Sequence, residues 1–320
     1  MSPLLREAED FRAAIERAAD IRGLGDPSFV EKDYWVTEIL RVLATDNPHD
    51  ITFKGGTSLS KGYGIIERFS EDIDILVVPD GGASNKDREA KLRSITENVA
   101  GRLNLKWEEY RNPGRGRDSS RGDLILYSPQ YETIAALAQG VVLETGYGDG
   151  HEPKEVVQVS PLVGAVPELE GEGYADIEPF SIGVLEPRRT LIEKLYAVHH
   201  TGTLFLKGDE PPRRIGRHFY DIYQLLEHDD TKAKLERDRE RFGSLCTEVE
   251  RISQARFGGV TPRPSDGFAA SPVFTAESES DLRKWLEERY SEVQALIVKG
   301  TDTPSLGAIL KRVEELGDLL

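Results

Sequence analysis

The segment FKGGTSLSKGYGIIERFSEDIDILVV, residues 53–78, joins a glycine turn to a strand-like run that carries two aspartates. Side chains alternate between the two faces of a strand, so Asp72 and Asp74 point to one side, about 7 Å apart. Two such carboxylates can share a pair of Mg²⁺ ions, which lie about 4 Å apart in two-metal phosphoryl-transfer sites. The Gly-Gly-Thr-Ser turn offers backbone N–H groups and a close approach for a triphosphate. Together the two features predict a site that moves a nucleotide.

Each feature alone is also typical of ordinary structure, since such turns and Asp-x-Asp pairs on solvent-facing strands are common. Their order on one predicted turn–helix–strand unit favours a functional interpretation. The face pattern agrees, because Ile73 and Ile75 line one side while Asp72 and Asp74 share the other side with Leu76. Carboxylates in a largely apolar row are costly to bury without a partner or a metal.

Several motifs resemble one family of proteins. KGGTSL at 54–59 and RFSEDIDI at 68–75 resemble the nucleotidyltransferase superfamily that includes DNA polymerase β. They are more closely similar to the AbiEii/MenT family, the toxins of type IV toxin–antitoxin and abortive-infection systems. EKDYWV at 31–36, TLIEKL at 190–195 and RHFYDIY at 217–223 agree with that family, so the resemblance extends over roughly residues 25–230.

The resemblance implies transfer of an NMP from an NTP to an acceptor, with release of pyrophosphate. Asp72 and Asp74 would hold Mg²⁺, or Mn²⁺ in its place. The implied acceptor is RNA, at the 3′ end of a tRNA, and the implied partner is a cognate antitoxin. The phosphates would be held by the turn that comprises Gly55, Gly56, Thr57 and Ser58.

Two residues of the C-terminal half are further candidates. Lys194 shares a predicted helix face with Leu191 and Leu195, so it either extends past an apolar stripe or reaches into a cleft. Asp221 borders the apolar stripe of the next predicted helix, where a salt bridge to Arg217 or Arg214 is the structural alternative. The resemblance favours the cleft for Lys194, where it would hold the triphosphate, and an active-site position for Asp221, which would orient Lys194 or the acceptor.

Four residues near the predicted strands are weaker candidates. Glu144 ends an apolar run and is a candidate third carboxylate that could act as general base on the attacking hydroxyl. Lys54 and Lys61 flank the glycine turn, where either could contact phosphate or lie on the surface. Ser70 lies two residues before Asp72, where it could contact the nucleotide or simply begin the strand.

Composition describes a globular protein without a membrane anchor. The 320 residues are 38% hydrophobic and 31% charged, and no apolar run approaches the roughly 20 residues of a membrane span. The single cysteine, Cys246, excludes an internal disulfide and fits a reducing cytoplasm. We expect a cytoplasmic protein that acts as a monomer.

The net charge of −16 argues against a general nucleic-acid binder. One segment differs, because residues 111–121 carry four arginines and one aspartate. A basic patch on an acidic body suits a protein that touches a polyanion in one place, although arginine-rich loops are also often simply solvated. The candidate RNA-binding residues of this segment are Arg111, Arg115, Arg117 and Arg121.

The pattern of the chain predicts a bilobed α/β (α+β) protein. Residues 4–22, 29–44, 58–69 and 86–103 read as helices, residues 51–54 and 72–78 as strands, and residues 104–182 as β-rich. From residue 187 the pattern is helical, and one of the expected helices spans residues 231–256. We therefore expect a nucleotidyltransferase domain with a small mixed sheet over residues 1–185 and a helical domain over 186–320 that completes the active-site cleft.

Two other functions remain open at this stage. One is a nucleotidyltransferase that modifies a small molecule or a protein instead of RNA. The other is a nucleotide-binding module without transfer activity, although pure binding would not require both Asp72 and Asp74.

Overall fold

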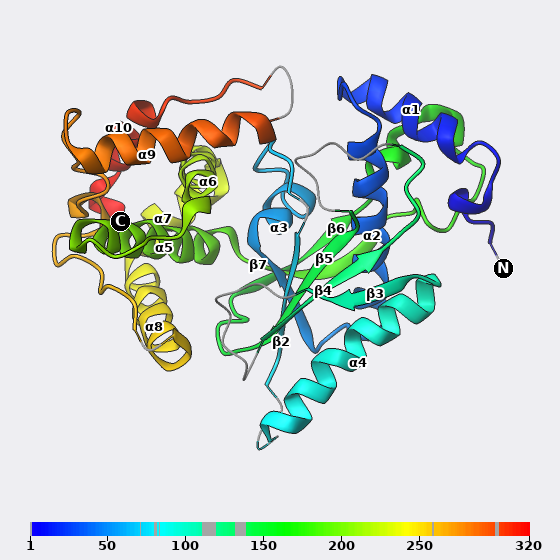
Figure 1. The fold of residues 1–320 in the computed structure, drawn as a ribbon, viewed down its shortest axis with the longest axis horizontal. Coiled ribbons are helices and arrows are strands. Elements are labelled where there is room, and N and C mark those ends of the chain that lie inside the picture. The colour runs from blue at the N-terminus through cyan, green and yellow to red at the C-terminus, as the bar shows by residue number, and fades with distance from the viewer. Residues whose placement is uncertain are drawn as a thin grey trace. The chain divides into compact units, whose positions relative to one another are not determined.

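The computed structural model describes residues 2–70, 72–79, 82, 84–110, 120–131, 139–257, 259–297 and 301–320. The chain divides into two compact units, and Figure 1 shows their elements. The first unit comprises Met1–Gly64 and Phe69–Leu185, and the second comprises Ile65–Arg68 and Glu186–Leu320. The fold class is α/β, as predicted, and the short segment Ile65–Arg68 belongs to the second unit although it lies early in the chain.

A mixed β-sheet forms the centre of the first unit. Its strands are β1 (Ile51–Lys54), β2 (Asp72–Val77), β3 (Lys106–Glu109), β4 (Ser120–Leu126), β5 (Val141–Tyr147), β6 (Lys154–Val159) and β7 (Phe180–Leu185). They form a seven-stranded sheet in the order β3-β4-β5-β2-β1-β7-β6 within the described residues, so the sheet is larger than expected. The strand β2 lies in the middle, antiparallel to β1 and parallel to β5.

Two helices cover the apolar face of this sheet. The helices of the first unit are α1 (Phe11–Arg22), α2 (Ser28–Asp46), α3 (Gly55–Lys61) and α4 (Asn85–Leu103). Apolar side chains of α2 and α4 pack in one core with Ile73, Ile75 and Val77 of β2, all at most 2% exposed. Because side chains alternate along a strand, Asp72 and Asp74 point away from that core.

The second unit is helical and is organised around α6. Its helices are α5 (Pro187–Lys207), α6 (Gly216–Glu227), α7 (Asp229–Arg237), α8 (Arg239–Phe257), α9 (Asp281–Ser291) and α10 (Leu306–Glu315). The stripe of Phe219, Ile222, Leu225 and Leu226 on α6 is fully buried. The helices α5, α7, α9 and α10 contact α6, and this explains why the apolar side chains of α6 are fully buried.

Most predicted elements are present, but three predictions of extent were wrong. The helix predicted over residues 58–69 is α3, which begins three residues earlier, at Gly55, and ends at Lys61 before two glycines, Gly62 and Gly64. The helix predicted over residues 4–22 is divided into a 3₁₀ turn, Leu5–Glu7, and α1. The single helix predicted over residues 231–256 is two helices, α7 and α8, because Asp238 between them departs from helical geometry.

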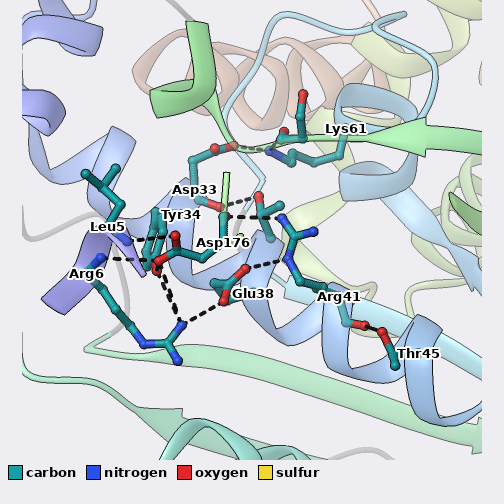
Figure 2. Close-up of polar contacts among 11 residues, drawn as sticks. Leu5, Arg6, Asp33, Tyr34, Glu38, Arg41, Thr45, Lys61 and Asp176 are labelled. Atoms are coloured by element: carbon teal, nitrogen blue, oxygen red, sulfur yellow. Dashed lines mark hydrogen bonds and ion pairs between the residues drawn. The ribbon is translucent and has the colours of Figure 1, made fainter. Parts of the chain in front are cut away.

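A buried polar network attaches the N-terminal segment to α2, as Figure 2 shows. The carboxylate of Asp176 accepts hydrogen bonds from the Leu5 backbone N–H at 2.7 Å, from the Arg6 backbone N–H at 3.2 Å and from the Tyr34 hydroxyl at 2.5 Å. Arg6 also pairs with Glu38 of α2 at 2.8 Å. Since a buried carboxylate needs such donors, Asp176 makes the segment that precedes α1 part of the fold.

Replacement of Tyr34 by Phe should destabilise the first unit, because it removes one donor from the buried Asp176 carboxylate. We expect a loss of about 1–3 kcal/mol in the free energy of unfolding, measured by urea denaturation. Tyr131→Phe is the control, since the Tyr131 hydroxyl bonds the Arg12 carbonyl at an exposed position. Equal stability losses in the two variants would contradict the importance assigned to Asp176.

Candidate active site

The two aspartates of β2 lie in the centre of the sheet on one face. Asp72 and Asp74 are both half-buried, whereas Ile73 between them is fully buried on the opposite face. Asp74 lies opposite Lys54 of β1 in the antiparallel pairing. The structure therefore confirms that the side chains of β2 alternate between a core face and a carboxylate face.

Glu144 lies beside Asp74 on the neighbouring strand. In the parallel pairing of β2 with β5, Asp74 is in register with Glu144 and Asp72 with Val142. Residues in register on adjacent strands share a face and lie about 5 Å apart, so the structure brings all three carboxylates to the same face. Within the described ranges, no three His, Cys, Asp or Glu side chains converge closely enough to form a metal cluster by themselves.

Gly55 is required by its contact with Asp74. Its φ of +82° lies in the left-handed region, which favours glycine. A Cβ at this position would lie 2.2 Å from Asp74 Oδ2. The backbone at the start of α3 is thus packed directly on the carboxylate of β2, which joins the two features that the sequence places 19 positions apart (74 − 55).

The hydroxyl groups of Thr57 and Ser58 in the glycine turn form hydrogen bonds within the protein. Thr57 Oγ1 lies 2.8 Å from Ser70 Oγ and 2.5 Å from the Asp72 carbonyl oxygen. Ser58 Oγ donates to the Gly55 carbonyl oxygen at 2.9 Å. Thr57 and Ser58 are at most 1% exposed, so contact with a phosphate at this turn would come from the backbone of Gly55 and Gly56.

Lys61, the second lysine near the turn, has a structural role. Its ammonium donates to Asp33 Oδ1 at 2.7 Å and to the Ser160 carbonyl oxygen at 2.9 Å. The other oxygen of Asp33 accepts the Leu162 backbone N–H at 2.7 Å. Figure 2 shows Lys61 beside Asp33, so this ion pair attaches the end of α3 to α2.

A second polar cluster lies within the helical unit. Lys194 of α5 donates to Asp221 Oδ2 of α6 at 2.6 Å. Arg68 donates to both oxygens of the same carboxylate, from Nε to Oδ1 at 2.6 Å and from Nη2 to Oδ2 at 2.7 Å. Asp221 is fully buried, and Lys194 and Arg68 are 6% and 3% exposed. Asp221 therefore forms its ion pairs with Lys194, as one of the predicted roles requires, and with Arg68, which is distant in the chain.

The charged groups of this cluster shift one another's pKa values. Burial alone would raise the pKa of Asp221, but the charges of Arg68 and Lys194 lower it below its usual value. Burial lowers the pKa of Lys194, against the attraction of Asp221. Burial, together with the charges of Lys194 and Arg217, also lowers the pKa of His218, so this imidazole is neutral at pH 7. The cluster therefore presents cations at a carboxylate that remains ionised.

No sequence pattern indicated a role for Arg68. It is the first residue of the RFSEDIDI motif, and its place in that motif is the feature of the sequence that could have indicated a functional role. Of the four candidate RNA-binding arginines, Arg111, Arg115 and Arg117 lie outside the described residues. Arg121 pairs with the buried Asp123 at 2.6 Å, and its guanidinium carbon lies 5.1 Å from the centroid of the Trp107 ring, so this arginine has a structural role.

Comparison with known proteins identifies the family. A model of the nucleotidyl transferase AbiEii toxins of type IV toxin–antitoxin systems matches residues 39–312. The chain belongs to the AbiEii family. Among solved structures, MenT4, nucleotidyltransferase toxin Rv2826c from Mycobacterium tuberculosis H37Rv, is similar, with 16% identity over 96% of each chain and a TM-score of 0.49. No curated protein sequence matched the chain.

The AbiEii match includes both groups of candidate residues, since it begins before Lys54 and ends after Asp221. Membership of a nucleotidyltransferase family agrees with the activity predicted from the glycine turn and the two aspartates. Among the helices of the described residues, none has both the length and the apolar character needed to cross a bilayer.

Replacement of Gly55 by Ala should reduce the free energy of unfolding more than replacement of another glycine by Ala. Gly64→Ala is the control, because Gly64 also has a positive φ, +65°, but has open space around its Cβ direction. We expect the control to lose about 1–2 kcal/mol from the left-handed backbone alone, and Gly55→Ala to lose more because its methyl group displaces Asp74. Urea denaturation measures both losses, and equal values would show that the contact with Asp74 is not tight.

Asp221→Asn should destabilise the second unit in a pH-dependent manner. Loss of the charge leaves two buried cations without their anion, which costs about 3–5 kcal/mol at pH 7. Because the folded-state pKa of Asp221 is below its unfolded value of about 3.9, the stabilisation is complete above that value and is lost as the pH falls below it. The difference in unfolding free energy between wild type and variant should be constant above pH ~5 and decrease below pH ~4. A difference that does not change down to the acid limit of the measurement would contradict the ionised pair.

Proposed function

We propose that this protein transfers an NMP from an NTP to the 3′ end of a tRNA and thereby arrests growth. The observation that carries the proposal is the packing of the Gly55 backbone on Asp74, beside Asp72 and Glu144 on one face of the sheet. This arrangement puts backbone N–H groups suited to phosphate next to carboxylates suited to a metal. Membership of the AbiEii family supports nucleotidyl transfer as the reaction.

The carboxylates fit a magnesium ion by their chemistry. Mg²⁺ takes oxygen ligands and needs only one or two protein carboxylates when substrate phosphates complete its shell. Asp72 and Asp74 would hold Mg²⁺ or Mn²⁺, which would neutralise charge on the phosphoryl oxygens when bound. Glu144 is in register with Asp74 and would accept the proton of the attacking hydroxyl.

The remaining candidate residues would orient the triphosphate. The backbone of Gly55 and Gly56 would donate to phosphate oxygens, and Lys54, opposite Asp74, would add a positive charge. Thr57, Ser58 and Ser70 would act indirectly, by holding the turn through their internal hydrogen bonds. We propose that Lys194, oriented by Asp221, binds the same triphosphate and offsets its charge in the transition state.

The proposed partners follow from the family and the substrate. A type IV toxin–antitoxin family implies a cognate antitoxin, and we propose that the protein works as a monomer in the cytoplasm. The RNA contact proposed for Arg111, Arg115 and Arg117 rests on their sequence alone. Arg121 would contribute to it only by giving up part of its pairing with Asp123.

Transfer of labelled nucleotide tests the proposal directly. The protein is incubated with total cellular RNA, Mg²⁺ and each of the α-labelled NTPs in turn, and the products are separated on a denaturing gel. We expect label in RNA of tRNA size with at least one NTP, and no label in EDTA. Label in a protein or a small molecule alone would replace RNA as the acceptor, and no label in any product would refute transfer.

Asp72→Asn and Asp74→Asn should each reduce the transfer rate by about 10²–10³-fold, as expected when one group that stabilises transition-state charge is removed. Both variants should remain folded by circular dichroism, because the changes keep the side-chain shape. Asp46→Asn is the control, since this carboxylate lies on α2 and bonds Asn98 at 2.7 Å. Wild-type rates in either β2 variant would refute the metal-binding role of that residue.

A further inference from the structure

The segment Ile65–Arg68 is anchored in the helical unit, although the residues on both sides of it belong to the first unit. Ile65 and Ile66 are buried, at 9% and 4% exposure. The Glu67 backbone N–H donates to the Tyr220 hydroxyl at 3.3 Å, and its carboxylate accepts from Thr301 at 2.8 Å. Arg68 forms an antiparallel β-bridge with Ile297. The backbone of Arg68 is therefore fixed independently of its side chain.

The side chain of Arg68 holds both oxygens of one carboxylate. Its Nε and Nη2 atoms donate to Asp221 Oδ1 and Oδ2 at 2.6 and 2.7 Å. Two parallel hydrogen bonds from a planar guanidinium fix the rotation of the carboxylate plane, which one hydrogen bond does not. Asp221 Oδ2 is also the acceptor for Lys194, so the orientation of Asp221 determines where the Lys194 ammonium lies.

We propose that Arg68 is a positioning residue for the transfer reaction, because it fixes the Asp221 carboxylate that holds the Lys194 ammonium. This inference rests on the proposed function, in which Lys194 binds the triphosphate. A rigid support is what such a group requires, since a catalytic side chain must be held to within about 0.5 Å by its neighbours. The anchored backbone of segment 65–68 supplies that rigidity.

Arg68→Lys is the informative variant. It keeps the positive charge beside Asp221, but a single ammonium group cannot hold both carboxylate oxygens in one plane. The matched control is Arg188→Lys in the same unit. Arg188 is similarly buried, at 6% exposure, but its Nε donates to Glu186 at 3.0 Å and not to Asp221. Circular dichroism establishes the folded fraction of each variant.

Steady-state transfer kinetics form the first measurement. We expect kcat of Arg68→Lys to fall by roughly 10–100-fold, the usual loss when a group that orients an active-site ligand is replaced, with little change in the KM for NTP. Arg188→Lys should keep the wild-type kcat. An unchanged kcat in Arg68→Lys, or an equal loss in both variants at equal folded fraction, would overturn the positioning role.

Acetylation of Lys194 is the second measurement and does not require activity. Wild-type Lys194 is buried and bonded to Asp221, so its reaction with acetic anhydride should be slow when followed by mass spectrometry. We expect faster acetylation in Arg68→Lys and the wild-type rate in Arg188→Lys. Unchanged acetylation in Arg68→Lys would overturn the inference. If the wild type transfers no nucleotide, the proposed function and the catalytic part of this inference fail together, whereas acetylation still decides whether Arg68 holds the pair.

Discussion

The contact between the Gly55 backbone and the Asp74 carboxylate is the constraint on which the candidate site of the first unit depends. It fixes the start of α3 against the middle of β2, and only a residue without Cβ permits it. The hydroxyls of Thr57 and Ser70 then join the same two segments. Because these side chains are directed into the protein, the groups that the turn can offer to an anion are backbone N–H groups. These need no rearrangement of side chains when a ligand arrives.

Local patterns predicted the part of this site that local sequence determines. The alternation of Ile73 and Ile75 with Asp72 and Asp74 follows from the period of a strand, and it identified both the core face and the carboxylate face. The position of Glu144 depends on the register between β2 and β5, a long-range pairing that no local pattern contains. The predicted helix 58–69 was wrong because α3 ends at Lys61, Gly64 adopts a positive φ of +65°, and the residues after it pack in the other unit.

The role of Arg68 shows where such predictions stop. Arg68 and Asp221 are separated by 153 positions, so nothing near either residue indicates the other. The alternatives that the sequence offered for Asp221 were arginines on its own helix or just before it. A short ion pair across that distance depends on the anchoring of segment 65–68, which is a property of the folded second unit. The motif that contains Arg68 indicated a functional segment, but it gave neither a role nor a partner for this residue.

The energetics of the second cluster favour a chemical purpose over a stabilising one. Removing Arg68, Lys194 and Asp221 from water carries a desolvation penalty, and well-packed apolar residues of similar volume often give equal or greater stability than a buried ion pair. Burial here lowers the pKa of Lys194, while two cations keep Asp221 ionised. A lysine that is desolvated, held by a fixed carboxylate and 6% exposed is suited to meet an anion without the loss of rotational freedom that a surface lysine would undergo. Under the proposed function, the cluster would give up some stability of the helical unit for an ammonium group in a defined position.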